Sequence, residues 1–128
     1  MSVQSLCVQY LDALNQGDLS QVLALFTQDA TVDSPLYGSK TATQFYTELF
    51  ADTSRSETKL LHVYEATNDG DSVALHFEYK WTLSSGVLVE FECVDVFYLN
   101  QDQTQFSKLK IIYDTALLRS EFNQLSTQ

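Results

Sequence analysis

The sequence predicts an α+β domain whose helices precede an antiparallel sheet. Apolar residues recur at helical spacing up to about residue 50, and beyond about residue 58 they alternate with polar residues at a period of two. Because the two patterns occupy separate parts of the chain, the helices are expected to pack together on one face of the sheet. A chain of 128 residues is the length of one ordinary domain, so a single domain is predicted over residues 1–128.

Two helices are predicted at the start of the chain. The first covers residues 3 to about 15, where apolar residues are spaced for one helix face, and Gly17 ends it. The second begins at Asp18, which forms a capping-box pattern with Gln21 three residues later.

An extended segment and a third helix follow. Residues 29–35 are predicted to be extended, because Pro35 disfavours helix directly before it. A turn at Gly38 and Ser39 then leads into a helix over residues 42–50.

Four strands are predicted in the rest of the chain. The first covers residues 58–67 and is closed by a turn at residues 68–71. The next two cover residues 73–83 and 87–99, and the last strand places Leu109, Ile111 and Tyr113 on one face. Short turns between consecutive strands predict an antiparallel meander.

Asp95 interrupts the apolar face of the strand at residues 87–99. Every second residue from Val87 to Leu99 is otherwise apolar, so the strand period carries this carboxylate onto an apolar surface. A charge buried there without a partner is costly, so the group is expected to be hydrogen-bonded, paired, or neutral with a raised pKa. The sequence therefore predicts a polar group in an apolar pocket, without naming its ligand.

The charge composition excludes several classes of partner. The net charge is -10, and no cluster of Lys or Arg offsets it locally, so nucleic acids and anionic membrane surfaces are not expected partners. No apolar stretch approaches the ~20 residues that span a bilayer, and no basic segment followed by an apolar signal core begins the chain. A cytoplasmic location is therefore expected.

The cysteines and histidines do not form a metal-binding pattern. Cys7 and Cys93 lie on predicted apolar faces and are expected to be buried free thiols. His62 and His76 occur in unrelated contexts, and neither CxxC nor HxxxH spacing occurs. No metal or other cofactor is predicted.

The order of elements and several strings resemble the superfamily of nuclear transport factor 2 and ketosteroid isomerase, including its SnoaL-like polyketide-cyclase branch. The matching strings are YLDALNQGDLSQVLALFTQDATVDSP at 10–35, YGSKTATQFYTELF at 37–50, VDVFYL at 94–99 and IIYDTALLR at 111–119. The resemblance implies a cone in which a curved, mostly antiparallel sheet wraps around the N-terminal helices and leaves an apolar cavity. It also implies a homodimer and a small apolar ligand.

The resemblance also implies a pair of hydrogen-bond donors. In the isomerases a first-helix tyrosine, seven residues before the glycine that ends the helix, donates to the enolate oxygen, and Tyr10 stands seven before Gly17 here. A protonated aspartate in a string like VDVFYL is their second donor, and Asp95 holds that place. Together these groups would stabilise a carbonyl or phenolate oxygen.

The position of the isomerases' general base departs from the pattern. Their proton-shuttling aspartate precedes the proline, and that position is Ser34 here. A serine without an adjacent base cannot do this work. Asp33 is a candidate only if the segment twists or its register shifts, because neighbouring residues on a strand point to opposite sides.

Further candidates for the cavity come from the strands. Tyr113 occupies an aromatic pocket-lining position of the isomerases, and Trp81 belongs to an apolar stripe that is core or cavity wall. His62, between Leu60 and Tyr64, is expected to be partly buried and is a candidate ligand-binding or proton-transfer group.

Three kinds of function remain open at this stage. One is an enzyme of isomerase or cyclase type that stabilises an enolate with Tyr10 and Asp95. Another is a non-catalytic carrier in which the same pair orients a carbonyl or phenol group. The third is a protein-interaction or dimerisation module with a vestigial pocket. The missing base at Ser34 favours the carrier over a simple isomerase, and the retained donor pair counts against the module.

Overall fold

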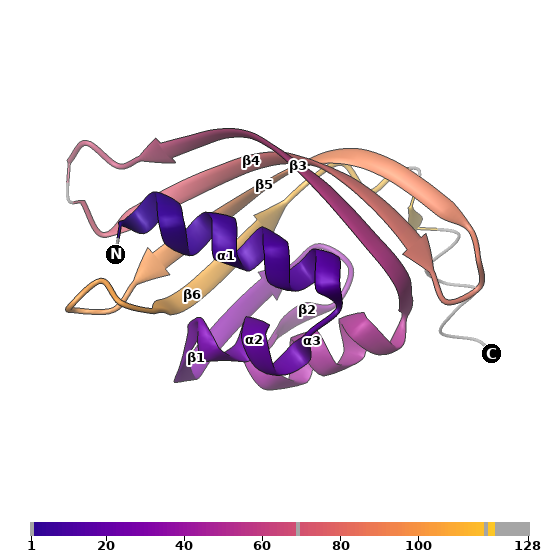
Figure 1. Cartoon of the computed structure of the whole chain (residues 1–128), viewed down its shortest axis with the longest axis horizontal. Coiled ribbons are helices and arrows are strands. Elements are labelled where there is room, and N and C mark those ends of the chain that lie inside the picture. The colour runs from indigo at the N-terminus through magenta and orange to yellow at the C-terminus, as the bar shows by residue number, and fades with distance from the viewer. Residues whose placement is uncertain (1, 69, 117, 120–128) are drawn as a thin grey trace.

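The computed structural model describes residues 2–68, 70–116, 118 and 119. It confirms the α+β class, with a sheet of mainly antiparallel strands and with β1 and β2 lying between the second and third helices in the chain (Figure 1). The helices are α1 (Val3–Gln16), α2 (Leu19–Ala24) and α3 (Ala42–Ala51). The strands are β1 (Phe26–Ser34), β2 (Gly38–Thr41), β3 (Thr53–Glu65), β4 (Ser72–Leu83), β5 (Leu88–Leu99) and β6 (Phe106–Ile112).

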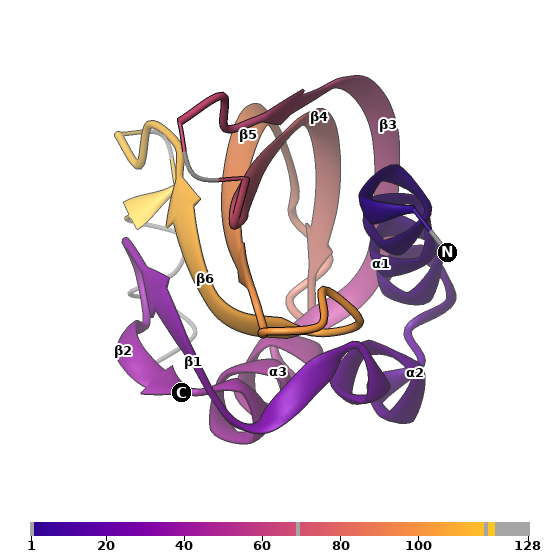
Figure 2. The ribbon, with the colours of Figure 1, turned by 90° about the vertical axis from the view of Figure 1, so that its left-hand side faces the viewer.

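The sheet curls strongly but does not close into a barrel. Its six strands lie in the order β2-β1-β6-β5-β4-β3, and every neighbouring pair is antiparallel except β1 and β6. The helix α1 runs beside β3, while α2 and α3 lie across the open side of the curl (Figure 2). The cone implied by the family resemblance is thus confirmed.

Local sequence signals set the helix ends as predicted. The side chain of Asp18 accepts a hydrogen bond from the Gln21 amide at 3.1 Å and begins α2. Gly17 takes a left-handed conformation with φ of 65°, and its amide bonds to the Leu14 carbonyl at 3.0 Å. The next amide bonds back to Ala13, which completes the hydrogen bonding at the C-terminus of α1.

Several strand limits differ from the prediction. The strand β1 begins at Phe26 rather than residue 29, and β3 begins at Thr53 rather than residue 58. The segment that begins at Gly38 was predicted as a turn alone, but it continues into the short strand β2, which pairs with β1. The start of β1 pairs with the distant Phe106 of β6, and the start of β3 pairs with Leu83 at the far end of its hairpin with β4. Such pairing carries no local sequence signal. Asp69, part of the turn predicted at residues 68–71, lies outside the described residues.

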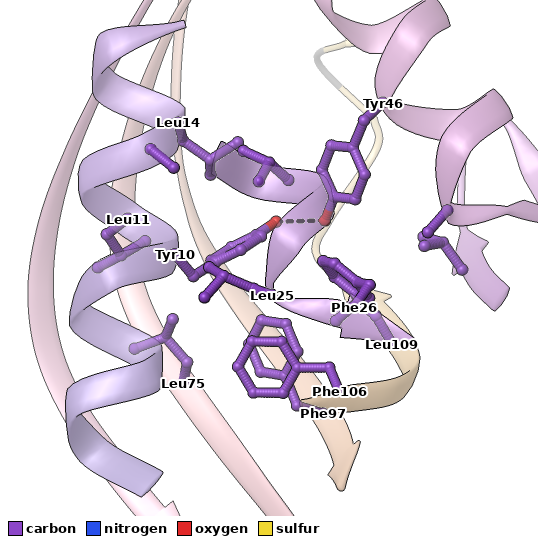
Figure 3. Packing of buried hydrophobic residues seen from close by; sticks show 14 of the residues in the cluster. Tyr10, Leu11, Leu14, Leu25, Phe26, Tyr46, Leu75, Phe97, Phe106 and Leu109 are labelled. Atoms are coloured by element: carbon purple, nitrogen blue, oxygen red, sulfur yellow. Dashed lines mark hydrogen bonds between the residues drawn. The ribbon is translucent and has the colours of Figure 1, made fainter. Parts of the chain in front are cut away.

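The core fills the space between the concave face of the sheet and the helices. Alternate residues of β4 and β5 point inward, as predicted, and Leu75, Phe77 and Phe97 are almost completely buried. The rings of Phe97 and Phe106 stack with centroids 4.0 Å apart (Figure 3). In the part of the chain that the structure describes, no helix is both long and apolar enough to cross a membrane.

Candidate functional site

Asp95 lies on the inner face of β5, where the strand period places it. Its neighbours across the sheet are Leu75 of β4 and Ile111 of β6, and only 2% of the residue is exposed. Burial raises its pKa from 3.8 to about 7, although hydrogen bonds from Cys93 and Tyr10 favour the carboxylate and act in the opposite direction. A neutral carboxylic acid is therefore accessible to this group near neutral pH.

The carboxyl group of Asp95 accepts a hydrogen bond from a neighbouring thiol. The Cys93 thiol, two residues earlier on the same strand face, lies 3.1 Å from Oδ1 of Asp95. Burial raises the pKa of this thiol far above its ordinary value, and the nearby carboxylate raises it further. The thiol is thus protonated at neutral pH and donates its hydrogen. The hydroxyl of Tyr10 lines the same cavity and lowers the pKa of Asp95 in the same direction as the thiol does.

Tyr10 reaches the carboxyl group from α1 and is itself supported by α3. Its hydroxyl lies 2.7 Å from the hydroxyl of Tyr46, a fully buried residue (Figure 3). A phenol has one proton to give. When Tyr10 gives its proton to the Asp95 carboxylate, Tyr46 must donate to Tyr10, so the three groups form a directed chain.

Sequence reasoning missed Tyr46, because its spacing with Phe45 and Leu49 fits an ordinary helix core. The available signal was its chemical type. A tyrosine at a position this deep in a helix face needs a partner for its hydroxyl, which a phenylalanine would not.

Asp95, Cys93 and Tyr10 line one cavity inside the curled sheet. The cavity has a volume of about 40 Å³, which is room for a few water molecules. Phe77, Tyr79 and Trp81 of β4 form an aromatic wall, and the half-buried Phe91 and Tyr113 lie at its more exposed end. The site is therefore an apolar cavity with a polar group at its buried floor.

Five of the residues singled out from the sequence meet in this cavity. They are Tyr10, Ser34, Trp81, Asp95 and Tyr113. The indole N–H of Trp81 donates to the Thr53 hydroxyl at 2.7 Å, so this residue contributes its ring face rather than its polar atom.

Asp33 and His62 are not among the residues that line the cavity. Asp33 accepts a hydrogen bond from the Ser39 hydroxyl on an exposed part of β1, while its neighbours Val32 and Ser34 point inward. His62 is exposed rather than partly buried, and its ring stacks on His76 at 6.0 Å. An irregularity in β3 at Leu60 to His62 changes the alternation on which its predicted burial depended.

Ser34 holds a turn where the isomerases carry their base. Its hydroxyl oxygen accepts hydrogen bonds from the amides of Leu36 and Tyr37, both at 3.3 Å. The serine is thus committed to structure at the edge of the cavity.

No metal centre is found among the described residues. In residues 2–68, 70–116, 118 and 119, no three His, Cys, Asp or Glu side chains gather closely enough to hold an ion. Cys7 and Cys93 are both buried and free, and burial raises the pKa of Cys7 to about 12.

A family model described as a SnoaL-like domain matches residues 8–104. The chain belongs to this SnoaL-like family. No curated protein matches the sequence. The family assignment confirms the resemblance drawn from the sequence strings and adds no specific reaction.

Solved structures share the fold of this SnoaL-like chain at low sequence identity. A hypothetical protein with a ketosteroid isomerase-like fold from Catenulispora acidiphila, in complex with trimethylamine, has a TM-score of 0.78 at 12% identity, covering 95% of this chain and 95% of that chain. PrhC from Penicillium brasilianum has a TM-score of 0.78 at 15% identity, covering 98% and 88%. TerC, co-crystallized with polyporic acid, has a TM-score of 0.78 at 14% identity, covering 94% and 98%.

Proposed function

We propose that this SnoaL-like chain binds a small apolar molecule through a carbonyl or phenol oxygen, which hydrogen-bonds to Asp95 and Tyr10 at the cavity floor. One observation carries the proposal. A carboxyl group that is 2% exposed lines an otherwise largely apolar cavity, and its pKa of about 7 keeps a donating neutral form available.

The arrangement around Asp95 supports an acceptor oxygen as the bound group. Cys93 already donates to one oxygen of the carboxyl group, so the proton that Asp95 carries when neutral is best placed for an acceptor oxygen of a ligand. The aromatic wall of Phe77 and Trp81 would contact the apolar part of the ligand. Polyporic acid, with which the structural relative TerC was co-crystallized, belongs in a ligand panel for this reason.

Enolate chemistry of isomerase or cyclase type is a second candidate, and the observation that favours it is the acidity of Asp95. A pKa of about 7 is close to the value that suits a general acid or base at neutral pH. Asp33 and Ser34 offer no comparable group in the cavity, because one is directed to Ser39 and the other holds a turn. In this version Asp95 itself moves the proton, while Tyr10 stabilises the oxygen.

The binding proposal is tested with para-ethylacetophenone and para-ethylphenol as probes. We expect Tyr10→Phe to weaken binding by about 5- to 30-fold, the loss of one buried hydrogen bond. Dissociation constants from NMR titration measure the effect. Tyr98→Phe is the matched control, because this tyrosine is 41% exposed on the outer face of the sheet.

The same samples separate a carrier from an enzyme. If the chain has enolate chemistry, the acetyl protons of para-ethylacetophenone exchange with D₂O faster in its presence, and Asp95→Asn abolishes the acceleration more than the affinity. A carrier binds the ketone without accelerating exchange. If Tyr10→Phe changes the dissociation constant of neither probe, the interaction module with a vestigial pocket is favoured instead.

A further inference from the structure

The cavity has a second polar group, at the end opposite Asp95. Ile111 pairs with Asp95 on one side, and on the other side the parallel pairing of Asp33 with Lys110 brings Ser34 beside Ile111. The side chains of Ser34, Ile111 and Asp95 all line the cavity. Two strand spacings separate Ser34 from Asp95, which is roughly 10 Å between their Cα atoms.

Ser34 and Tyr113 both line this end of the cavity. A serine hydroxyl has two lone pairs and one proton. The amides of Leu36 and Tyr37 donate to the Ser34 hydroxyl oxygen, so this group keeps one proton to donate at the cavity edge. The Tyr113 hydroxyl lines the same cavity and offers a phenolic proton there.

The other polar atoms of the aromatic lining are already directed to protein partners. The Tyr37 hydroxyl donates to Asp52 at 2.6 Å, and the Tyr79 hydroxyl lies 2.8 Å from that of Ser56. Tyr113 lies at the half-buried end, and its ring packs on Phe91 with centroids 4.7 Å apart. It is therefore the phenol of the lining best placed to meet a ligand.

We infer that the cavity takes a compact planar ligand with an oxygen acceptor at each end, one bound at Asp95 and Tyr10 and the other at Tyr113. This inference rests on the proposed function and narrows its ligand class. A volume of about 40 Å³ is too small for an aromatic ring, so the ligand must displace the half-buried rings of Phe91 and Tyr113 outward.

Two probes of nearly equal shape test the second contact. Para-diacetylbenzene carries an oxygen at each end, whereas para-ethylacetophenone has a methylene in place of the second carbonyl. We expect para-diacetylbenzene to bind the wild-type chain more tightly. The dissociation constant of para-ethylacetophenone divided by that of para-diacetylbenzene should fall by about 5- to 10-fold in Tyr113→Phe, because para-diacetylbenzene loses one hydrogen bond. The affinity for para-ethylacetophenone should be unchanged. Tyr98→Phe should leave the ratio unchanged.

The outcomes distinguish this inference from the proposed function. If the two probes bind the wild-type chain equally, or Tyr113→Phe weakens the binding of both alike, the second contact is overturned. The proposed function still stands in that case, provided that Tyr10→Phe weakens the binding of para-ethylacetophenone. If neither probe binds the wild-type chain, the proposed function fails and the inference fails with it. The wild-type comparison decides the matter even if Tyr113→Phe folds poorly.

Discussion

At the scale of single residues, Asp95 makes folding stability depend on pH. The unfolded chain releases this proton near pH 3.8, whereas the folded chain holds it until about pH 7. Between these values the folded state binds more protons, so the free energy of unfolding falls as pH rises through the window. The group's contribution is constant below and above the window. The full difference is on the order of 4 kcal/mol.

Asp95→Asn should remove this dependence. The amide is close in shape and keeps no titrating proton, so the variant should gain stability relative to the wild type as pH rises from about 5 to about 8. Urea unfolding of both chains across that range measures the difference. Parallel stability curves would mean that Asp95 titrates near its ordinary pKa in the folded chain, and the donating role proposed for it would be lost.

A site residue could be predicted from the sequence only where the pattern within its own helix or strand reveals its position. Asp95 was found because a strand period of two is local, and its burial is confirmed. The sequence pattern predicts only a core residue at Tyr46 and a buried free thiol at Cys93. The contact of Tyr46 with Tyr10 depends on packing between two helices, and that of Cys93 with Asp95 depends on side-chain geometry. Ser34 could be placed beside the cavity, but the amides that donate to its hydroxyl belong to a turn that sequence pattern does not resolve.

At the scale of elements, the end of α1 depends on one glycine. Gly17 has φ of 65°, and a Cβ atom built there would meet no heavy atom within 4 Å. Gly17→Ala should therefore cost about 1 kcal/mol of stability for conformational reasons alone. Gly17→Asn should cost less, because asparagine tolerates this conformation. Urea midpoints rank the three chains, and an alanine variant as stable as the wild type would exclude this explanation.

The strands show where sequence pattern stops being informative. The alternation in β4 and β5 predicted both strands and their buried faces, because each pairs with neighbours that follow it closely in the chain. The parallel pairing of β1 with β6 joins distant segments, and periodicity within one segment does not encode a partner. The cavity depends on that distant pairing, since it brings Ser34 to Ile111.

At the scale of the whole molecule, the outer face of the sheet differs from the rest of the surface. It exposes Tyr64, Tyr98 and Ile112 at 55%, 41% and 48%. The chain carries a net charge of -10, but here basic and acidic residues alternate, as the pairing of Lys59 with Glu78 and of Lys80 with Glu90 illustrates. A strongly acidic molecule repels a second copy of itself except where charges of both signs are mixed.

The homodimer implied by the family resemblance is therefore expected to use this outer face. Ile112→Glu should convert a wild-type dimer to monomer, because it places an uncompensated charge among apolar side chains. Val8→Glu is the matched control, since Val8 is 39% exposed on α1, away from the outer face. Sedimentation velocity at micromolar concentration separates the two states. A monomeric wild-type chain, or a dimer broken by Val8→Glu and not by Ile112→Glu, would contradict this assignment and return the outer face to ordinary solvated surface.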